Sequence, residues 1–117
     1  MSIGKILLIE RNNIIAMDIE QTLMGNGYVV EIVKYGVEGL EKIKQKEYDL
    51  IISDSDMQRM NGEHFYIEVF SLNKDLAKKI MFISGDITEF IRSTGNPFLE
   101  KPFSDEQLIE AVMNKIL

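Results

Sequence analysis

The stretch DLIISD, residues 49–54, decides the fold. Its centre is short, apolar and contains two β-branched residues, and an Asp flanks it on either side. A run of this kind is typical of a strand that is buried on both faces, as the strands of a parallel sheet are. We therefore expect a strand over residues 49–53, with Asp54 just beyond its carboxyl end.

Similar apolar runs recur along the chain, and helical patterns separate them. Ile15, Ile19 and Leu23 are spaced four residues apart and form one apolar stripe of a helix, which the turn at residues 25–27 (GNG) ends. Residues 104–107 (SDEQ) form a capping box at the start of the last helix. Further strands are expected at residues 6–9, 28–33, 80–83 and 98–100, and further helices from residue 36, over 65–72 and over 88–93.

Five strands that alternate with five helices predict right-handed βαβ units, and hence a parallel sheet covered by helices on both faces. No repeat, linker or low-complexity tract divides the chain, so residues 1–117 are expected to form one domain. Because the last helical pattern runs to the end of the chain, any effector domain is expected outside it. In sheets of this class, ligands bind beyond the carboxyl ends of the strands.

The composition excludes several classes of function. The chain has 13 Lys and Arg against 19 Asp and Glu and no Lys/Arg-rich run, which argues against direct binding to nucleic acid or an anionic membrane. It has no Cys, so disulfides, Cys-ligated zinc and thiol catalysis are excluded. No apolar run approaches the roughly 18 residues of a membrane span. No signal-peptide core follows Met1, so a cytoplasmic location is expected.

Polar and charged side chains follow the expected strands at the end where ligands bind. These residues are Glu10 and Arg11, Asp54 and Asp56, Ser84, and Lys101. If the strands take the order 2-1-3-4-5, the switch point lies between the first and third strands, which brings Glu10 and Asp54 together. Clustered carboxylates favour a hard cation such as Mg²⁺, and a carboxylate beside it can attack a phosphoryl group. Asp54, Ser84 and Lys101 are residue types that suit phosphoryl transfer.

With these motifs, the whole chain resembles a response-regulator receiver domain of two-component signalling. The resemblance rests on residues 6–10 (ILLIE), 49–54 (DLIISD), 57–62 (MQRMNG), 80–85 (IMFISG) and 98–103 (FLEKPF). It implies a flavodoxin-like α/β fold, with a doubly wound parallel sheet of order 2-1-3-4-5. It also implies a signalling switch rather than an enzyme, with at most slow self-catalysed phosphoryl transfer. The implied partner is a histidine kinase or a histidine phosphotransfer domain, and residues 93–103 are similar to receivers attached to hybrid sensor kinases.

The resemblance also implies a role for each side chain at the strand ends. Asp54 is the phosphoacceptor, which takes the phosphoryl group from a phosphohistidine. Ser84 is the switch hydroxyl, and Lys101 is the ammonium that pairs with the phosphoryl group. Phe98 is the aromatic residue that follows the hydroxyl inward. The bond between Lys101 and Pro102 is expected to be cis.

Arg11 is the main departure from the family pattern. The family usually has two acidic residues after the first strand, and the second binds Mg²⁺ directly, whereas an Arg cannot ligate a metal. The metal-binding set that is left comprises Glu10, Asp54 and Asp56. Arg11 is either a neutral change or an internal cation that replaces Mg²⁺. In the second case we predict that it folds over the pocket and pairs with Asp54 or Asp56.

Two other functions compete with that of a phosphoacceptor. A pseudo-receiver would dock a partner without phosphorylation, and Arg11 favours this alternative. A phosphatase resembling the haloacid dehalogenases is suggested by the D-x-D spacing of Asp54 and Asp56, but the chain lacks the greater length and later acidic pair of those enzymes. The expected partner or homodimer face lies above Ser84 and Phe98 and consists of residues 88–93, 98–100 and 104–116.

Overall fold

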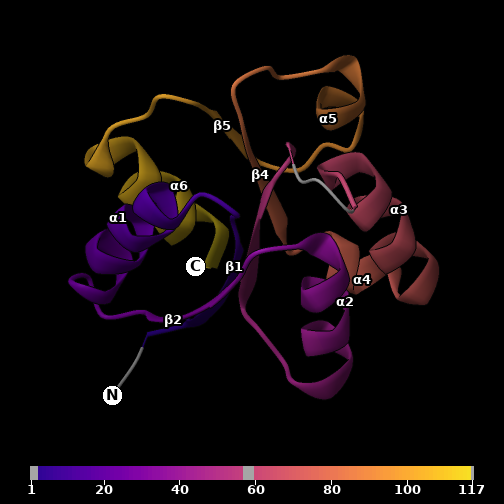
Figure 1. Ribbon diagram of the computed structural model, residues 1–117, viewed down its shortest axis with the longest axis horizontal. Coiled ribbons are helices and arrows are strands. Elements are labelled where there is room, and N and C mark those ends of the chain that lie inside the picture. The colour runs from indigo at the N-terminus through magenta and orange to yellow at the C-terminus, as the bar shows by residue number, and fades with distance from the viewer. Residues whose placement is uncertain (1–2, 57–59, 117) are drawn as a thin grey trace.

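The computed structural model describes residues 3–56 and 60–116, which form a five-stranded sheet flanked by helices (Figure 1). All strand pairs are parallel, and the order β2-β1-β3-β4-β5 confirms the predicted doubly wound fold. The strands are β1 (Lys5–Ile9), β2 (Val29–Val33), β3 (Leu50–Asp54), β4 (Ile80–Ser84) and β5 (Phe98–Glu100). The helices are α1 (Asn13–Met24), α2 (Gly36–Gln45), α3 (Gly62–Leu72), α4 (Lys74–Ala77), α5 (Glu89–Ser93) and α6 (Asp105–Ile116).

β3 is the middle strand of the sheet, and all of its residues are buried. It pairs with β1 on one side and with β4 on the other. In this register Ile9 lies opposite Ser53, and Asp54 lies opposite Ile83. The carboxyl ends of β1, β3 and β4 therefore meet at one edge of the sheet, as the sequence pattern predicts.

The sheet separates two hydrophobic cores, because successive residues of a strand point to opposite faces. In Figure 1, α1 and α6 cover one face of the sheet, and the other helices cover the opposite face. Leu8 packs on the first face with Leu23 and Val112, whereas Leu7 packs on the second face with Phe65. Each fully buried side chain of this size contributes about 1.5–3 kcal/mol relative to an exposed one.

Side-chain caps fix where several helices begin. The Asn12 Oδ1 accepts hydrogen bonds from the amides of Ile14 and Ile15, at 3.0 and 3.1 Å, and so caps α1. The predicted capping box at α6 is present, because the Ser104 amide donates to the Gln107 side chain and the Gln107 amide donates to the Ser104 hydroxyl. The motif at residues 57–62, which forms part of the family resemblance, lies partly outside the described residues.

The short helix α4 is an addition to the predicted elements. The sequence pattern ends a helix at Leu72 and assigns no structure before the next strand. Asn73 ends α3 and then caps α4, since its Oδ1 accepts hydrogen bonds from the amides of Asp75 and Leu76, at 2.9 and 3.2 Å. With four residues, α4 is too short to show an apolar periodicity. No helix within residues 3–56 and 60–116 has the length and apolar character needed to cross a membrane.

Gly62 allows α3 to begin close to the backbone that follows Asp54. A Cβ at this position would lie 2.7 Å from the Ser55 Cα, and the Gly62 amide donates a hydrogen bond to the Ser55 carbonyl at 3.1 Å. We expect Gly62→Ala to lower the free energy of unfolding by about 1–3 kcal/mol, because the added methyl group overpacks this contact. Urea denaturation measures the change, with Gly85→Ala as the control because a Cβ there meets nothing within 4 Å. Equal losses in the two variants would contradict the packing argument.

Glu31 on β2 is the centre of a cluster of cations at the edge of the sheet. Its carboxylate forms ion pairs with Lys42 at 2.9 Å and Lys46 at 3.4 Å, and it accepts a hydrogen bond from the Tyr48 hydroxyl at 2.8 Å. The hydrogen bond from Lys42 is the largest cause that lowers the pKa of the Glu31 carboxyl, to about 2. The cluster therefore favours the charged form of Glu31 in the folded state.

We expect Glu31→Gln to destabilise the fold in a pH-dependent way. Because the pKa of Glu31 is lower in the folded state, its charge contributes stability above the ordinary value of 4.5, and this contribution is lost as the pH falls toward 2. The loss is expected to be about 1 kcal/mol near neutral pH, since water partly screens the cluster. Urea denaturation at several pH values measures it, with Glu41→Gln as a more exposed control. A loss that stays constant down to about pH 3 would contradict this account.

Candidate functional site

Asp54 ends β3 at the carboxyl edge of the sheet, and only 3% of the residue is exposed. Its Oδ1 accepts a hydrogen bond from the Asp56 amide at 3.0 Å. Its Oδ2 lies 3.3 Å from the Nζ of Lys101. The carboxylate is thus held by one backbone amide and one ammonium group, and its orientation is fixed by β3 and by the segment that follows it.

Glu10 follows β1 and is 1% exposed. Its Oε2 accepts a hydrogen bond from the Nζ of Lys101 at 3.1 Å, and its Oε1 accepts one from the Asn12 amide at 3.2 Å. Burial and then the nearby charge of Asp54 raise the pKa of the Glu10 carboxyl, although Lys101 opposes both effects. The adjacent positions of β1 and β3 explain why these two carboxylates meet, as the strand order predicts.

Lys101 follows β5 and extends its side chain to both buried carboxylates. Its backbone amide donates a hydrogen bond to the Ser84 carbonyl at 2.7 Å, which ties the end of β5 to the end of β4. The bond from Lys101 to Pro102 is cis, as the family resemblance implies. One ammonium group therefore balances two acidic side chains, those of Glu10 and Asp54.

The hydroxyl of Ser84 is buried at the end of β4 and belongs to a local hydrogen-bond network. It donates to the Asp86 carbonyl at 2.7 Å and accepts from the Asp86 amide at 3.1 Å. It also accepts a hydrogen bond from the hydroxyl of Ser55. Ser55 is not among the residues expected at the site, and its place directly after Asp54 is the one signal in the sequence that points to it.

Phe98 on β5 is half-buried and packs against the core on the side of α5. The guanidinium carbon of Arg92 lies 5.2 Å from the centre of its ring, which is within the range of a cation–π contact. Arg92 is not among the residues that the sequence predicts at the site. No pattern in the chain points to it, because the contact joins α5 to β5 across the intervening loop.

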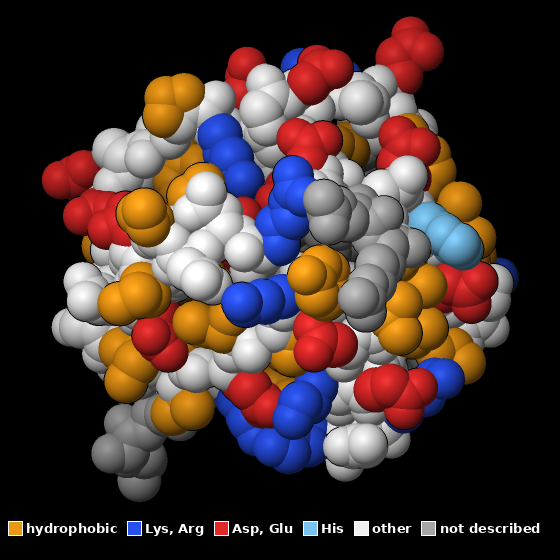
Figure 2. Space-filling model, in the orientation of Figure 1, with side chains coloured by type: hydrophobic (Ala, Val, Ile, Leu, Met, Phe, Trp, Pro, Cys, Tyr) orange, Lys and Arg blue, Asp and Glu red, His pale blue; other side chains and the backbone are white. Residues whose placement is uncertain are grey.

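A cavity of about 580 Å³ lies beside these residues, and Arg11 lines it. The other lining residues are Ser55, Asp56, Asn61, Glu63, Ser84, Asp86, Thr88 and Ile91. Arg11 is thus the one cation among the described residues that line this cavity, together with three acidic side chains. Figure 2 shows Lys and Arg side chains near the middle of the viewed face.

The predicted ion pair between Arg11 and Asp54 or Asp56 is wrong. In the described part of the chain, Asp54 pairs with Lys101 alone, and neither Arg11 nor Asp56 has an ion-pair partner. The physical reason is that Asp54 is buried and already faces Lys101. Arg11 and Asp56 are both exposed, and two hydrated side chains gain little by pairing.

The residues expected to hold Mg²⁺ do not fit a magnesium site. Both carboxylate oxygens of Glu10 already accept hydrogen bonds, the Oδ2 of Asp54 faces an ammonium group, and the side chain of Asp56 is exposed. Within the described residues, no group of three or more acidic or His side chains is arranged to hold a metal ion. Arg11 lines the neighbouring cavity, and its guanidinium group cannot ligate a metal. The two buried carboxylates are matched to the ammonium of Lys101 instead.

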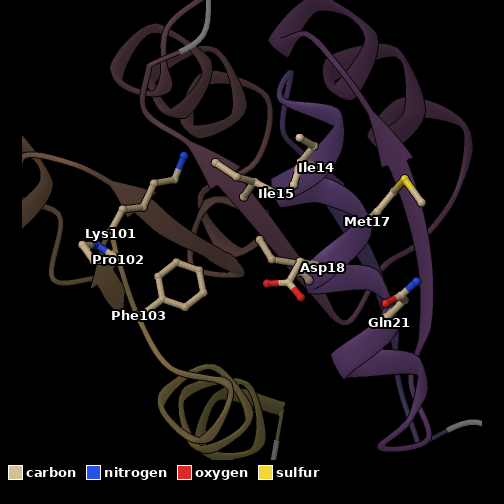
Figure 3. A pocket seen from close by; sticks show the side chains of 9 residues that line it. Ile14, Ile15, Met17, Asp18, Gln21, Lys101, Pro102 and Phe103 are labelled. Carbon is tan, nitrogen blue, oxygen red and sulfur yellow. The ribbon is translucent and has the colours of Figure 1, made fainter.

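A groove of about 730 Å³ lies between α1 and the connection from β5 to α6. In Figure 3, side chains of α1 form one side of it, and Lys101, Pro102 and Phe103 form the other. Ile14 and Met17 of α1 are 80% and 55% exposed, respectively. This groove is not predicted from the sequence, because the expected apolar stripe of α1 faces the core.

The sequence matches the family described as the response regulator receiver domain, over residues 6–113. The chain therefore belongs to this family and is a signalling module of two-component signal transduction rather than an enzyme. It is 27% identical over 108 residues to a response regulator, MprA, of Mycobacterium ulcerans, covering 90% of this chain and 47% of that protein. It is 30% identical over 118 residues to a probable transcriptional regulator, ycf29, of Pyropia yezoensis, covering 96% of this chain and 53% of that protein. The chain thus spans about half the length of these relatives.

Solved structures of receiver domains share this fold. The chemotaxis response regulator CheY4 of Vibrio cholerae is 27% identical and has a TM-score of 0.84, with 97% of this chain and 98% of that chain covered. The receiver domain of a sensor histidine kinase from Pseudomonas aeruginosa PAO1 is 23% identical and has a TM-score of 0.86, with 97% of each chain covered. That receiver holds a magnesium ion coordinated in its active site cleft. At this level of identity, the likeness to it concerns the fold alone.

Proposed function

We propose that this receiver accepts a phosphoryl group on Asp54 and thereby switches a partner or an attached domain. The observation that carries the proposal is the position of the Asp54 carboxylate, which is buried at the carboxyl edge of the sheet with its Oδ2 3.3 Å from the Lys101 ammonium. Asp54 precedes Ser55 in the chain, and both Ser55 and Ser84 line the cavity described above. A nucleophile, a cation and a hydroxyl group therefore lie at one end of the sheet.

The proposed reaction is a direct transfer from a phosphohistidine. An oxygen of the Asp54 carboxylate bonds to phosphorus while the bond from phosphorus to the histidine nitrogen breaks, and the electron pair of that bond stays on the imidazole. Lys101 is positioned to stabilise negative charge on the phosphoryl oxygens. The donor is a histidine kinase or a histidine phosphotransfer domain, and we propose the cytoplasm as the compartment. No step of this reaction is assigned to Mg²⁺, because the residues of the site do not fit that ion.

A phosphodonor assay tests this function. The protein is incubated with phosphoramidate and, separately, with a phosphorylated histidine phosphotransfer domain, and its intact mass is measured. We expect one phosphoryl group per chain, and we expect hydroxylamine to remove it, since an acyl phosphate is cleaved by this nucleophile. A label that resists hydroxylamine would assign the phosphoryl group to a hydroxyl such as that of Ser55 or Ser84, and would contradict the proposal.

The alternative function is a pseudo-receiver that docks its partner without phosphorylation. The observation that favours it is Arg11, which is exposed and occupies the place of the second acidic residue. If neither donor labels the protein, and its affinity for a partner is the same with and without the donors, this alternative replaces the first function.

We also propose that the surface of α5, β5 and α6 is the switch face, which contacts a partner or a second copy of the chain. The register of the sheet supports this choice, because Ser84 pairs with Glu100 and Phe82 pairs with Phe98 between β4 and β5. A change at Ser84 is thus one strand away from this surface. Amide exchange measured with and without phosphodonor is expected to change first in α5 and β5. Changes confined to α2 and α3 would contradict this assignment.

A further inference from the structure

One of the side chains that line the cavity beside Asp54 is a cation with no role in the proposed reaction as described so far. Arg11 lines this cavity, is exposed, and has no ion-pair partner in the described part of the chain. Lys101, by contrast, already contacts the carboxylates of both Glu10 and Asp54. Among the described residues of the site, one cation is therefore engaged and one is available.

The charges at the site show why a second cation is needed. A phosphoryl group on Asp54 carries about two negative charges and replaces the single charge of the carboxylate, so the site gains about one negative charge. The cavity wall already holds the acidic residues Asp56, Glu63 and Asp86, and the carboxylate of Glu10 contacts the same ammonium group as Asp54 does. The single ammonium of Lys101 does not balance this sum. Because the residues of the site do not fit Mg²⁺, the balancing charge has to come from the chain itself.

The chemistry of an Arg side chain suits this role. The guanidinium group is planar, is always charged in proteins and donates paired hydrogen bonds to phosphate oxygens. An Arg that contacts a transferring phosphoryl group stabilises the charge that develops on its equatorial oxygens. Arg11 follows Glu10 at the end of β1, next to β3, so its backbone is fixed beside the strand that carries Asp54.

We propose that Arg11 contacts the phosphoryl group on Asp54 and that phosphorylation of this receiver needs no divalent metal. This inference rests on the proposed phosphoacceptor function. In the transfer from phosphoramidate, a carboxylate oxygen of Asp54 bonds to phosphorus and the bond from phosphorus to nitrogen breaks. The nitrogen keeps the electron pair, takes a proton from water and leaves as ammonia. Arg11 and Lys101 remain protonated throughout and supply charge only.

The test compares phosphorylation rates in a chelator and in excess Mg²⁺. The full chain, Arg11→Ala, Arg11→Lys and Arg11→Asp are each incubated with phosphoramidate, and the phosphoprotein is quantified by intact mass. Lys78→Ala is the matched control, because it removes one exposed cation just before β4, at the opposite edge of the sheet. Calorimetric titration with Mg²⁺ alone gives a readout that does not depend on the reaction.

We expect the unmodified chain to be phosphorylated in the chelator at about the rate seen in Mg²⁺. Arg11→Ala is expected to slow the metal-free reaction by about tenfold or more, the effect of losing hydrogen bonds to a charged group. Arg11→Lys should recover part of this loss, and Lys78→Ala should leave the rate unchanged. Arg11→Asp should be slow in the chelator, faster in Mg²⁺, and able to bind Mg²⁺ more tightly than the unmodified chain in the titration.

Failure of the inference is distinguishable from failure of the proposed function. Labelling of Asp54 that occurs only in Mg²⁺ would overturn the inference and leave Asp54 as the phosphoacceptor. Labelling in the chelator that Arg11→Ala does not slow would overturn the role of Arg11. Absence of labelling in both conditions, from both donors, would overturn the phosphoacceptor function and the inference with it.

Discussion

Replacement of Asp54 by Asn is expected to abolish phosphorylation by a small phosphodonor while the fold stays intact. The amide has no nucleophilic oxygen of comparable strength, yet it has the shape of the carboxylate and keeps an oxygen that can accept the hydrogen bond from the Asp56 amide. The measurement is intact mass after incubation with phosphoramidate, combined with circular dichroism to check the fold. Among the described residues, Asp54 and Glu10 are the two buried carboxylates that contact Lys101, and Asp54 is the one that ends the middle strand of the sheet.

Asp56→Asn is the matched control for this experiment. It removes the same charge two residues away, but the contact that Asp56 makes with Asp54 uses its backbone amide, which the substitution leaves in place. We therefore expect this variant to be labelled. Phosphorylation of the Asp54→Asn protein at Asp56 or Glu10 would show that the acceptor has been assigned to the wrong residue.

Replacement of Lys101 by Met is expected to have the largest effect on stability. The substitution leaves Glu10 and Asp54 buried together without a cation. Removing one partner of a buried ion pair typically costs about 3–5 kcal/mol, and because the side chain of Lys101 is 22% exposed we expect about 2 kcal/mol near neutral pH. Urea denaturation measures this loss. Lys42→Met is the control, because it removes a cation from the more exposed carboxylate of Glu31.

The loss on removing Lys101 should depend on pH in a defined direction. The pKa of Glu10 is raised in the folded state, and Lys101 is among the groups that lower it. Proton binding by Glu10 therefore stabilises the folded state. This stabilisation is fully present below 4.5, the ordinary pKa of the unfolded chain, and it is lost as the pH rises through the higher pKa of the folded state. Without Lys101 the pKa of Glu10 rises further, so the deficit should be smallest below the ordinary pKa of 4.5 and should grow as the pH rises. A deficit that is independent of pH would mean that Lys101 stabilises the fold by packing alone.

The pattern of apolar runs predicts the fold because each strand is marked by a clear signal within a few residues of sequence. Each apolar run is short and bounded by polar residues, and parallel strands with both faces buried produce such runs. The position of Glu10 beside Asp54 follows from the same reasoning, since the strand order alone brings the ends of β1 and β3 together. The helix α4 is the exception, because it is short and its start depends on the Asn73 side chain.

The side-chain contacts of the site are less predictable. The expected pairing treats Arg11 as the cation of the acidic pocket, whereas Lys101 contacts both buried acids from the end of β5. The bond between the hydroxyls of Ser55 and Ser84 joins segments that are distant along the chain, and the contact of Arg92 with Phe98 joins a helix to the strand that follows it. Such contacts depend on the directions in which side chains point at the ends of strands and helices. The spacing of residues along one segment does not predict these directions.

The two cores on opposite faces of the sheet have a consequence for how this chain tolerates change. Leu23 and Val112 share one core, and Phe65 and Ile91 share the other, with the sheet between them. Substitutions on opposite faces that share no partners are expected to add in free energy, whereas substitutions within one core are expected to couple. The side that holds α1 and its groove can therefore diversify independently of the side that holds α5 and Phe98. The single five-stranded sheet thus separates two sets of core residues, and each set can change without affecting the other.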